Sequence, residues 1–166
     1  MKKYKRLAVA FTGKSNSGKT TLLIKISEKL QKDGYKVAMV KHDPHDKAIF
    51  DKEGKDSQRF SSTGADVVVI SPTRTTMFKR EKQSINQIIK LFGDFDYLLV
   101  EGLKSIPLPR ICVARDTLYK EYFDVTDTLA TDDSLDKANL PSDMKCLDLN
   151  NLDDIISWIN TNGKQV

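Results

Sequence analysis

The chain has 166 residues, of which 39% are hydrophobic and 30% are charged, and its formal net charge is +4. This length predicts a single domain over residues 1–166 that can bury a core without disulfides or a structural metal. No apolar stretch approaches the roughly 18–20 residues that cross a bilayer. The charge also falls short of the dense basic face of a nucleic-acid binder. We therefore expect a cytoplasmic protein that contacts neither membranes nor nucleic acids.

Short apolar segments alternate with amphipathic ones, a pattern typical of an α/β fold with a mainly parallel sheet and helices on both faces. Strands are predicted at 7–11, 36–41, 66–70, 97–100, 110–114 and 145–148, with a weaker one at 75–79. The β-branched run 67–70 is typical of a strand buried on both faces. Helices are predicted from Gly18 or Lys19 to Lys32, over 85–92 after Ser84, and over 152–159 after Asn150 or Asn151. The polar stretches 42–54 and 130–143 are predicted loops.

The segment GKSNSGKT matches the pattern GxxxxGK[ST] and lies between a predicted strand and a predicted helix. Its glycines allow successive backbone N–H groups to turn toward an anion, and the helix N-terminus adds its own free N–H groups. Lys19 is expected to reach the β- and γ-phosphates of a nucleoside triphosphate, and the Thr20 hydroxyl to coordinate Mg²⁺. The predicted nucleotide site comprises Gly13, Lys14, Ser15, Asn16, Ser17, Gly18, Lys19 and Thr20.

A second acidic group is expected near the metal, at the carboxyl end of a strand beside the first one. Glu101 follows the predicted strand 97–100, whereas Asp96 precedes it and lies at the wrong end. We therefore predict that Glu101 and Thr20 hold Mg²⁺ with hard oxygen ligands, directly or through water.

The polar stretch after the second predicted strand contains further candidates and is expected to sense the γ-phosphate or close over a ligand. Asp51 or Asp56 is predicted to add an outer carboxylate for Mg²⁺, although Asp56 or Ser57 is also placed to cap a helix that ends at Ser62. His42 and His45 have HxxH spacing, but neither a cysteine nor a third histidine accompanies them as in a dedicated metal site.

Several basic residues are candidates for binding anions. Lys104 and Arg110 follow the Glu101 strand and are expected beside the nucleotide. Lys14 occupies the loop position from which a lysine reaches the partner's nucleotide in deviant Walker loops of dimeric ATPases. Ser15 and Asn16 replace the glycines of those loops, so a solvated Lys14 is the other interpretation.

Together these segments resemble the MobB family of molybdopterin-guanine dinucleotide biosynthesis adaptor proteins. The resemblance rests on GKSNSGKTTL, VAMVKHDPH, DKEGKDSQRFSSTGAD, LLVEGLK and PRICVAR, and continues more weakly through LATDD and LDLNNLDDIISWI. It implies a P-loop NTPase fold of the SIMIBI type, a homodimer, GTP and Mg²⁺ as ligands, and weak hydrolysis without a dedicated general base. It also implies a partner guanylyltransferase that joins GMP to molybdopterin for molybdoenzymes, with molybdopterin itself a further candidate ligand. The phosphate site would then extend to Thr21. Lys41, His42 and Asp56 would line the phosphate side or respond to the partner, as would Arg110.

The sequence lacks the Asn-Lys-x-Asp motif by which most GTPases recognise guanine, so the expected base rests on the resemblance. Asp132 or Asp133 is a candidate acceptor for the guanine N1 and N2 donors, or else part of an acidic solvated loop. Two other functions stay open on the same frame. One is an ATP-dependent small-molecule kinase or ligase with Arg74 and Arg80 in a lid. The other is a metallochaperone that uses His42 and His45.

Overall fold

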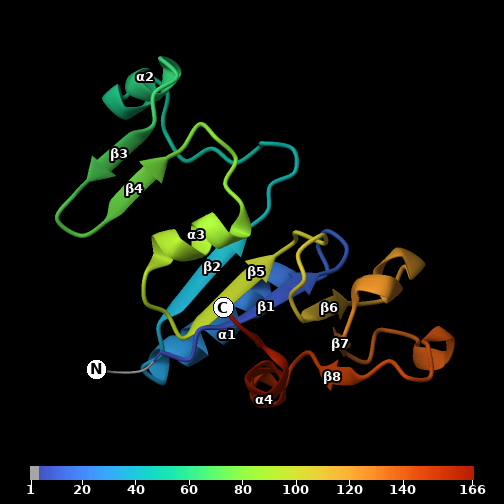
Figure 1. The fold of residues 1–166 in the computed structure, drawn as a ribbon. Coiled ribbons are helices and arrows are strands. Elements are labelled where there is room, and N and C mark those ends of the chain that lie inside the picture. The colour runs from blue at the N-terminus through green and yellow to red at the C-terminus, as the bar shows by residue number, and fades with distance from the viewer. Residues whose placement is uncertain (1–3) are drawn as a thin grey trace. The chain divides into compact units, whose positions relative to one another are not determined.

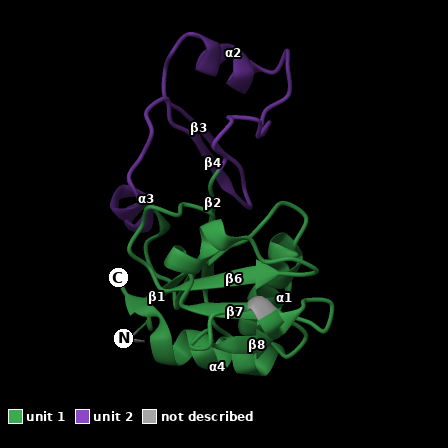
Figure 2. Cartoon of the chain, turned by 90° about the vertical axis from the view of Figure 1, so that its right-hand side faces the viewer, with its two compact units in different colours: residues 1–42, 91–166 green, residues 43–90 purple. Residues whose placement is uncertain are grey.

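The computed structural model describes residues 4–166. The chain forms two compact units, a larger one of residues 1–42 and 91–166 and a smaller one of residues 43–90 (Figure 2). The predicted phosphate loop and Glu101 belong to the larger unit, whereas Asp51 and Asp56 belong to the smaller one. The single nucleotide-binding domain expected over residues 1–166 stays a prediction.

A mainly parallel sheet forms the centre of the larger unit (Figure 1). Its strands, each parallel to the next, are in spatial order β2 (Val37–Lys41), β5 (Tyr97–Glu101), β1 (Leu7–Thr12), β6 (Arg110–Ala114), β7 (Thr128–Thr131) and β8 (Cys146–Asp148). The short strand β9 (Lys164–Gln165) pairs antiparallel with β1. These strands confirm the predicted α/β class and, apart from β7 and β9, the segments predicted to build the sheet.

Strand β7 corrects the loop that the sequence predicts over residues 130–143. Its four residues are flanked by Asp127 and Asp132, so the apolar pattern is too short to stand out in the sequence. All four are buried, because β7 lies between β6 and β8. Its carboxyl end therefore brings Asp132 to the edge of the sheet where ligands bind in open α/β folds.

Helices cover both faces of this sheet, as predicted. α1 (Lys19–Lys32) and α4 (Leu152–Asn162) bury their apolar stripes in one core cluster with β1, β5 and β6. Cys112 and Ala114 alternate with the β6 residues of that cluster and so point to the opposite face. There they pack against Tyr122 of the short helix η1 (Lys120–Val125). Among residues 4–166, no helix is both long and apolar enough to cross a membrane.

The smaller unit contains α2 (Asp56–Ser62), the strands β3 (Val67–Ile70) and β4 (Thr75–Phe78), and most of α3 (Ile85–Phe92). β3 and β4 form an antiparallel hairpin that pairs with no other described strand. The prediction that 67–70 is buried on both faces is therefore wrong, since Val68 is 50% and Ile70 80% exposed. A β-branched run favours extended backbone whether or not it is covered, so composition predicted the strand but not its burial.

Arg110 is a buried structural residue, which corrects the expectation that its guanidinium binds an anionic ligand. Its side chain is only 2% exposed. The guanidinium donates hydrogen bonds of 3.0–3.3 Å to backbone carbonyl oxygens of the loop after β5, those of Gly102, Leu103, Lys104 and Ile106. Leu103 in this loop has a φ of +50°, a conformation that non-glycine residues rarely adopt. Arg110 therefore fixes the turn that follows Glu101.

We predict that Arg110→Met lowers the free energy of unfolding by about 2–4 kcal/mol, because it leaves several part-buried carbonyl groups without a donor. Urea unfolding monitored by circular dichroism measures the change. Arg74→Met is the matched control, because it removes an exposed arginine and is expected to cost less than about 0.5 kcal/mol. Equal stability of both variants would show that the Arg110 bonds do not support the fold.

Candidate functional site

The phosphate loop connects β1 to α1 and depends on glycine at its first position. Gly13 has a φ of +133°, and a Cβ built there would lie 2.2 Å from the backbone oxygen of Val113 in β6. Such a contact is far too short for any side chain, so only glycine lets the loop pass this close to β6. Gly18 is also left-handed, with a φ of +94°, and immediately precedes α1. The predicted strand–loop–helix context of the motif is confirmed.

Glu101 lies beside this loop because β1 and β5 are neighbouring parallel strands. Phe11 of β1 is in register with Glu101, so the carboxylate stands at the same sheet edge as the phosphate loop. The Thr20 hydroxyl donates to Glu101 Oε2 at 3.2 Å, and Lys41 Nζ lies 4.0 Å from Oε1. The adjacent His42 donates its backbone N–H to the Glu101 carbonyl at 2.9 Å. The structure thus brings together four of the residues predicted from the sequence.

Lys19 curls back over the loop. Its Nζ donates to the backbone oxygen of Lys14 at 2.6 Å. Burial lowers the pKa of Lys19, and the nearby Glu101 carboxylate acts in the opposite direction. A lysine that is partly desolvated and bonded to a neutral carbonyl is well placed to exchange that bond for a phosphate oxygen.

A cavity of about 430 Å³ lies between the phosphate loop and Glu101, and we call it the Lys19–Glu101 cavity. It is lined by Ser15, Asn16, Gly18, Lys19, Thr20, Thr21, Lys41 and Glu101. Its lining combines backbone N–H groups and ammonium groups with three hydroxyl groups and one carboxylate. The first two kinds suit phosphate, and the Thr20 hydroxyl and the Glu101 carboxylate fit Mg²⁺, which prefers hard oxygen donors.

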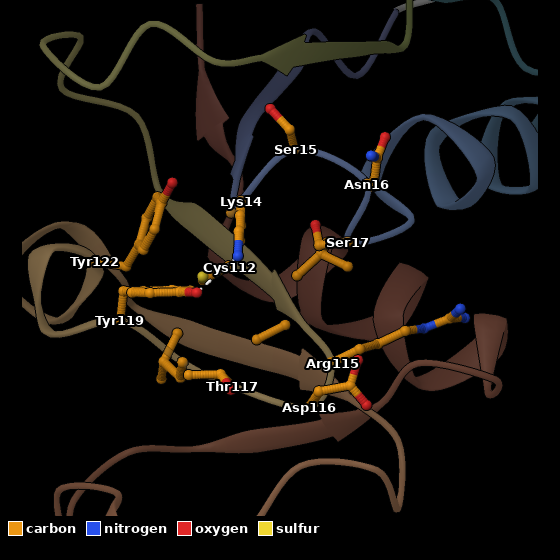
Figure 3. Close-up of a pocket in the computed structure, with 14 residues that line it drawn as sticks. Lys14, Ser15, Asn16, Ser17, Cys112, Arg115, Asp116, Thr117, Tyr119 and Tyr122 are labelled. Atoms are coloured by element: carbon orange, nitrogen blue, oxygen red, sulfur yellow. Dashed lines mark hydrogen bonds between the residues drawn. The ribbon is translucent and has the colours of Figure 1, made fainter.

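A second cavity of about 450 Å³ lies against the same loop and was not foreseen from the sequence (Figure 3). It is bounded by residues 13–17 of the phosphate loop and by the end of β6, the following segment 115–119, and Tyr122 of η1. We call it the Tyr119 cavity. Two tyrosines closely following the sixth strand, in a polar segment, were the only signal for it in the sequence.

A third cavity of about 250 Å³ lies at the carboxyl ends of β7 and β8, lined by Asp132, Asp133, Asp148 and Asn150 among others. Arg115 Nε contacts Asp132 Oδ2 at 3.1 Å, while Ser134 donates to the other oxygen. These hydrogen bonds and the Arg115 charge lower the pKa of Asp132, with the Ser134 side chain the largest cause. The Asp133 carboxylate is exposed and receives no hydrogen bond from residues 4–166.

Two predicted site residues lie in the smaller unit and are held by local contacts there. Asp51 accepts from Ser57 Oγ at 3.0 Å, and its second carboxylate oxygen is buried without a described partner. Asp56 is the first residue of α2 rather than its cap, which is Lys55, and it pairs with Arg59. The roles expected for Asp51 and Asp56 at Mg²⁺ or the phosphates stay predictions.

The residues behind the two alternative functions do not form a site of their own within the described chain. Arg80, expected in a kinase lid, follows the β3–β4 hairpin and bonds to Asp66 and to the Ser61 carbonyl. No group of three or more histidine, cysteine, aspartate or glutamate side chains between residues 4 and 166 is arranged to hold a metal ion. Within that part of the chain, no such group includes His42 and His45.

Known proteins resemble this chain in both sequence and fold. The family model for molybdopterin guanine dinucleotide synthesis protein B, MobB, matches residues 8–131. A molybdopterin-guanine dinucleotide biosynthesis adapter protein of Haemophilus influenzae is 31% identical over 159 residues, covering 91% of this chain and 86% of that protein. The crystal structure of Bacillus subtilis MobB matches with a TM-score of 0.69 at 26% identity, covering 91% of this chain and 96% of that one.

A putative adapter protein of the same description from Methanocaldococcus jannaschii is 32% identical over 114 residues, or 65% of this chain. Only 47% of that protein is covered, so the chain spans about half the length of this relative. The family model, in contrast, covers the phosphate loop, Glu101, the Tyr119 cavity and strand β7 in one continuous match. The chain therefore belongs to the MobB family.

Proposed function

We propose that this protein binds GTP with Mg²⁺ and serves as an adaptor in the synthesis of molybdopterin guanine dinucleotide. The observation that carries the nucleotide part is the Lys19–Glu101 cavity, where a phosphate loop faces a carboxylate on the neighbouring parallel strand. The adaptor role is supported by the names of the H. influenzae and M. jannaschii relatives.

In this proposal the backbone N–H groups of residues 13–20 and the N-terminus of α1 surround the phosphates. Lys19 leaves the Lys14 carbonyl, 2.6 Å away, and binds the β- and γ-phosphate oxygens. Thr20 and Glu101, already 3.2 Å apart, hold Mg²⁺ between them and the phosphates, directly or through water. Lys41 lies at the same carboxylate and neutralises part of the added negative charge.

One feature of the cavity favours a nucleotide-dependent accessory role over rapid hydrolysis of GTP. None of the described residues of the Lys19–Glu101 cavity is a histidine or a second carboxylate placed as a general base. We therefore expect weak GTP hydrolysis and a main role beside a separate molybdopterin guanylyltransferase that supplies product to molybdoenzymes.

A homodimer is the expected assembly, and the exposed apolar residues Val68, Ile70 and Met77 of the β3–β4 hairpin are a surface that such an assembly would cover.

We further propose that the third cavity recognises the guanine base. The Arg115 guanidinium lies 3.7 Å from the position of a Cβ on Gly18 and also pairs with Asp132, so it connects the end of the phosphate loop to this cavity. A carboxylate accepts hydrogen bonds from both guanine N1–H and the N2 amino group. Arg115 and Ser134 already occupy Asp132, so Asp133 is the free acceptor.

Calorimetric titration with GTP and then ATP, each with Mg²⁺, tests the nucleotide proposal. We expect GTP to bind more tightly, and Lys19→Ala to weaken its binding roughly 100-fold, because the ammonium facing the phosphates is lost. Lys25→Ala, which removes an exposed lysine elsewhere on α1, is the control and is expected to leave the affinity unchanged. Unaltered affinity in Lys19→Ala would rule out the Lys19–Glu101 cavity, and a preference for ATP would favour the kinase or ligase function.

Glu101→Gln tests the metal site separately. The amide is nearly isosteric but carries no charge, so we expect GTP binding to lose most of its dependence on Mg²⁺ while binding without the metal persists. The measurement is the GTP dissociation constant across a Mg²⁺ series, with Glu28→Gln on the exposed side of α1 as the matched control. The same Mg²⁺ response in both variants would show that Glu101 does not act at the metal.

Asp133→Asn tests base recognition through a change of specificity. Xanthine carries an oxygen, O2, where guanine carries its amino group, and an asparagine amide can donate to that oxygen. We therefore expect GTP to bind roughly 10- to 100-fold more weakly and XTP to bind more tightly. Competition of both nucleotides against a fluorescent GTP analogue measures the ratio. Asp132→Asn is compared in parallel, and an unchanged GTP to XTP ratio in both variants would place the base elsewhere.

A further inference from the structure

We propose that the Tyr119 cavity is a second ligand site, which holds a planar nitrogen heterocycle with an anionic substituent while a nucleotide occupies the Lys19–Glu101 cavity. The proposal goes beyond the nucleotide function, because it concerns a different molecule on the other side of the phosphate loop. It rests on the cavity's walls and on the charged groups at its rim.

The two cavities share only the tip of the phosphate loop. Ser15 and Asn16 line both of them. Lys19, Thr20 and Glu101 line only the first cavity, whereas the β6 residues, the segment 115–119 and Tyr122 line only the second. Phosphates held at Lys19 therefore leave the Tyr119 cavity free, and its volume of about 450 Å³ falls within the range of small-molecule sites.

The walls of the cavity suit a flat ring. Tyr119 and Tyr122 contribute aromatic rings, and Leu118 adds an apolar side chain. Lys104 covers the Tyr122 ring with its ammonium 4.0 Å from the ring centre, which fixes that side chain from outside the cavity. Cys112 also lines the cavity, and burial raises its pKa to about 11, so the thiol is neutral at physiological pH. Stacking on aromatic side chains is the common way in which proteins hold heterocycles.

One hydroxyl beside the cavity has no hydrogen-bond partner in the described part of the chain. The Ser17 side chain is only 8% exposed, and its hydroxyl has no hydrogen-bond partner among the described residues. That oxygen has almost no accessible surface, so it lies behind the cavity wall and does not face a bound ligand. Figure 3 shows Ser17 at the loop, with Tyr119 and Tyr122 drawn toward the other end of the cavity.

Charge then selects the substituents of the ring. The Lys14 ammonium reaches into the cavity, 2.7 Å from the Tyr119 hydroxyl, and forms no ion pair with a described carboxylate (Figure 3). It is the cation available to a bound anion, because the other one, Arg115, is paired with Asp132. Asp116 at the rim has a carboxylate without a described partner, which is an acceptor for a ring N–H group.

The test uses pterin-6-carboxylate, a fluorescent planar heterocycle with ring N–H groups and one anionic group. GTPγS with Mg²⁺ is first titrated alone, so that failure of the nucleotide function is seen on its own. The probe is then added to the full chain saturated with GTPγS. We expect saturable quenching of the probe, and weaker binding of uncharged pterin, which lacks the group that Lys14 binds.

Tyr119→Ala is expected to weaken probe binding roughly tenfold while GTPγS affinity stays the same, because only the second cavity loses its ring. Tyr119→Phe keeps the ring and should retain most of the binding. Phe92→Ala is the matched control, since Phe92 and Tyr119 are each 41% exposed and Phe92 lies outside this cavity.

Two results would overturn the proposal. The first is the absence of probe binding to the GTPγS-loaded chain or equal binding by Tyr119→Ala. The second is competition between probe and GTPγS together with loss of GTPγS affinity in Tyr119→Ala. That second pattern would make the Tyr119 cavity the pocket for the nucleotide's own base.

Discussion

The parallel pairing of β1 with β5 is the constraint on which the whole site depends. It places Phe11 opposite Glu101, so that the phosphate loop and the carboxylate leave the sheet side by side. A β5 shifted by one residue would turn Glu101 to the other face of the sheet and separate it from Thr20. The buried Arg110, on the next strand along the chain, stabilises this arrangement, because its guanidinium binds the turn that follows Glu101.

Lys14 lines the Tyr119 cavity and also contacts Lys19, which lines the Lys19–Glu101 cavity. Its carbonyl accepts the Lys19 bond on the phosphate side, and its ammonium contacts Tyr119 on the other side. A phosphate that draws Lys19 away frees the Lys14 carbonyl, and any movement of the loop that follows acts on the Tyr119 contact. The residue that sequence reasoning interpreted as either solvated or directed toward a partner nucleotide thus connects the two cavities of one chain.

The sequence predicted those features that are local. The phosphate loop follows from GKSNSGKT, and Glu101 from its place at the end of an apolar strand, because each depends on neighbouring residues and on a common strand direction. Arg110 was misjudged because nothing in the sequence distinguishes a guanidinium that binds carbonyls of its own loop from one that binds a ligand. The hairpin β3–β4 shows the same limit, since a β-branched run specifies extended backbone but not the surface that covers it.

Strand β7 is the missed element with the largest consequence for the site, because it brings Asp132 and Asp133 to the sheet edge. Once β7 stands beside β6, Arg115 at the end of one strand meets Asp132 at the end of the other, and the same guanidinium packs near Gly18. This contact joins the end of the phosphate loop to the third cavity. A loop over the same residues would have left the acidic pair in solvent, so the case for base recognition depends on a strand of four residues that alone brings Asp133 to the ligand edge of the sheet.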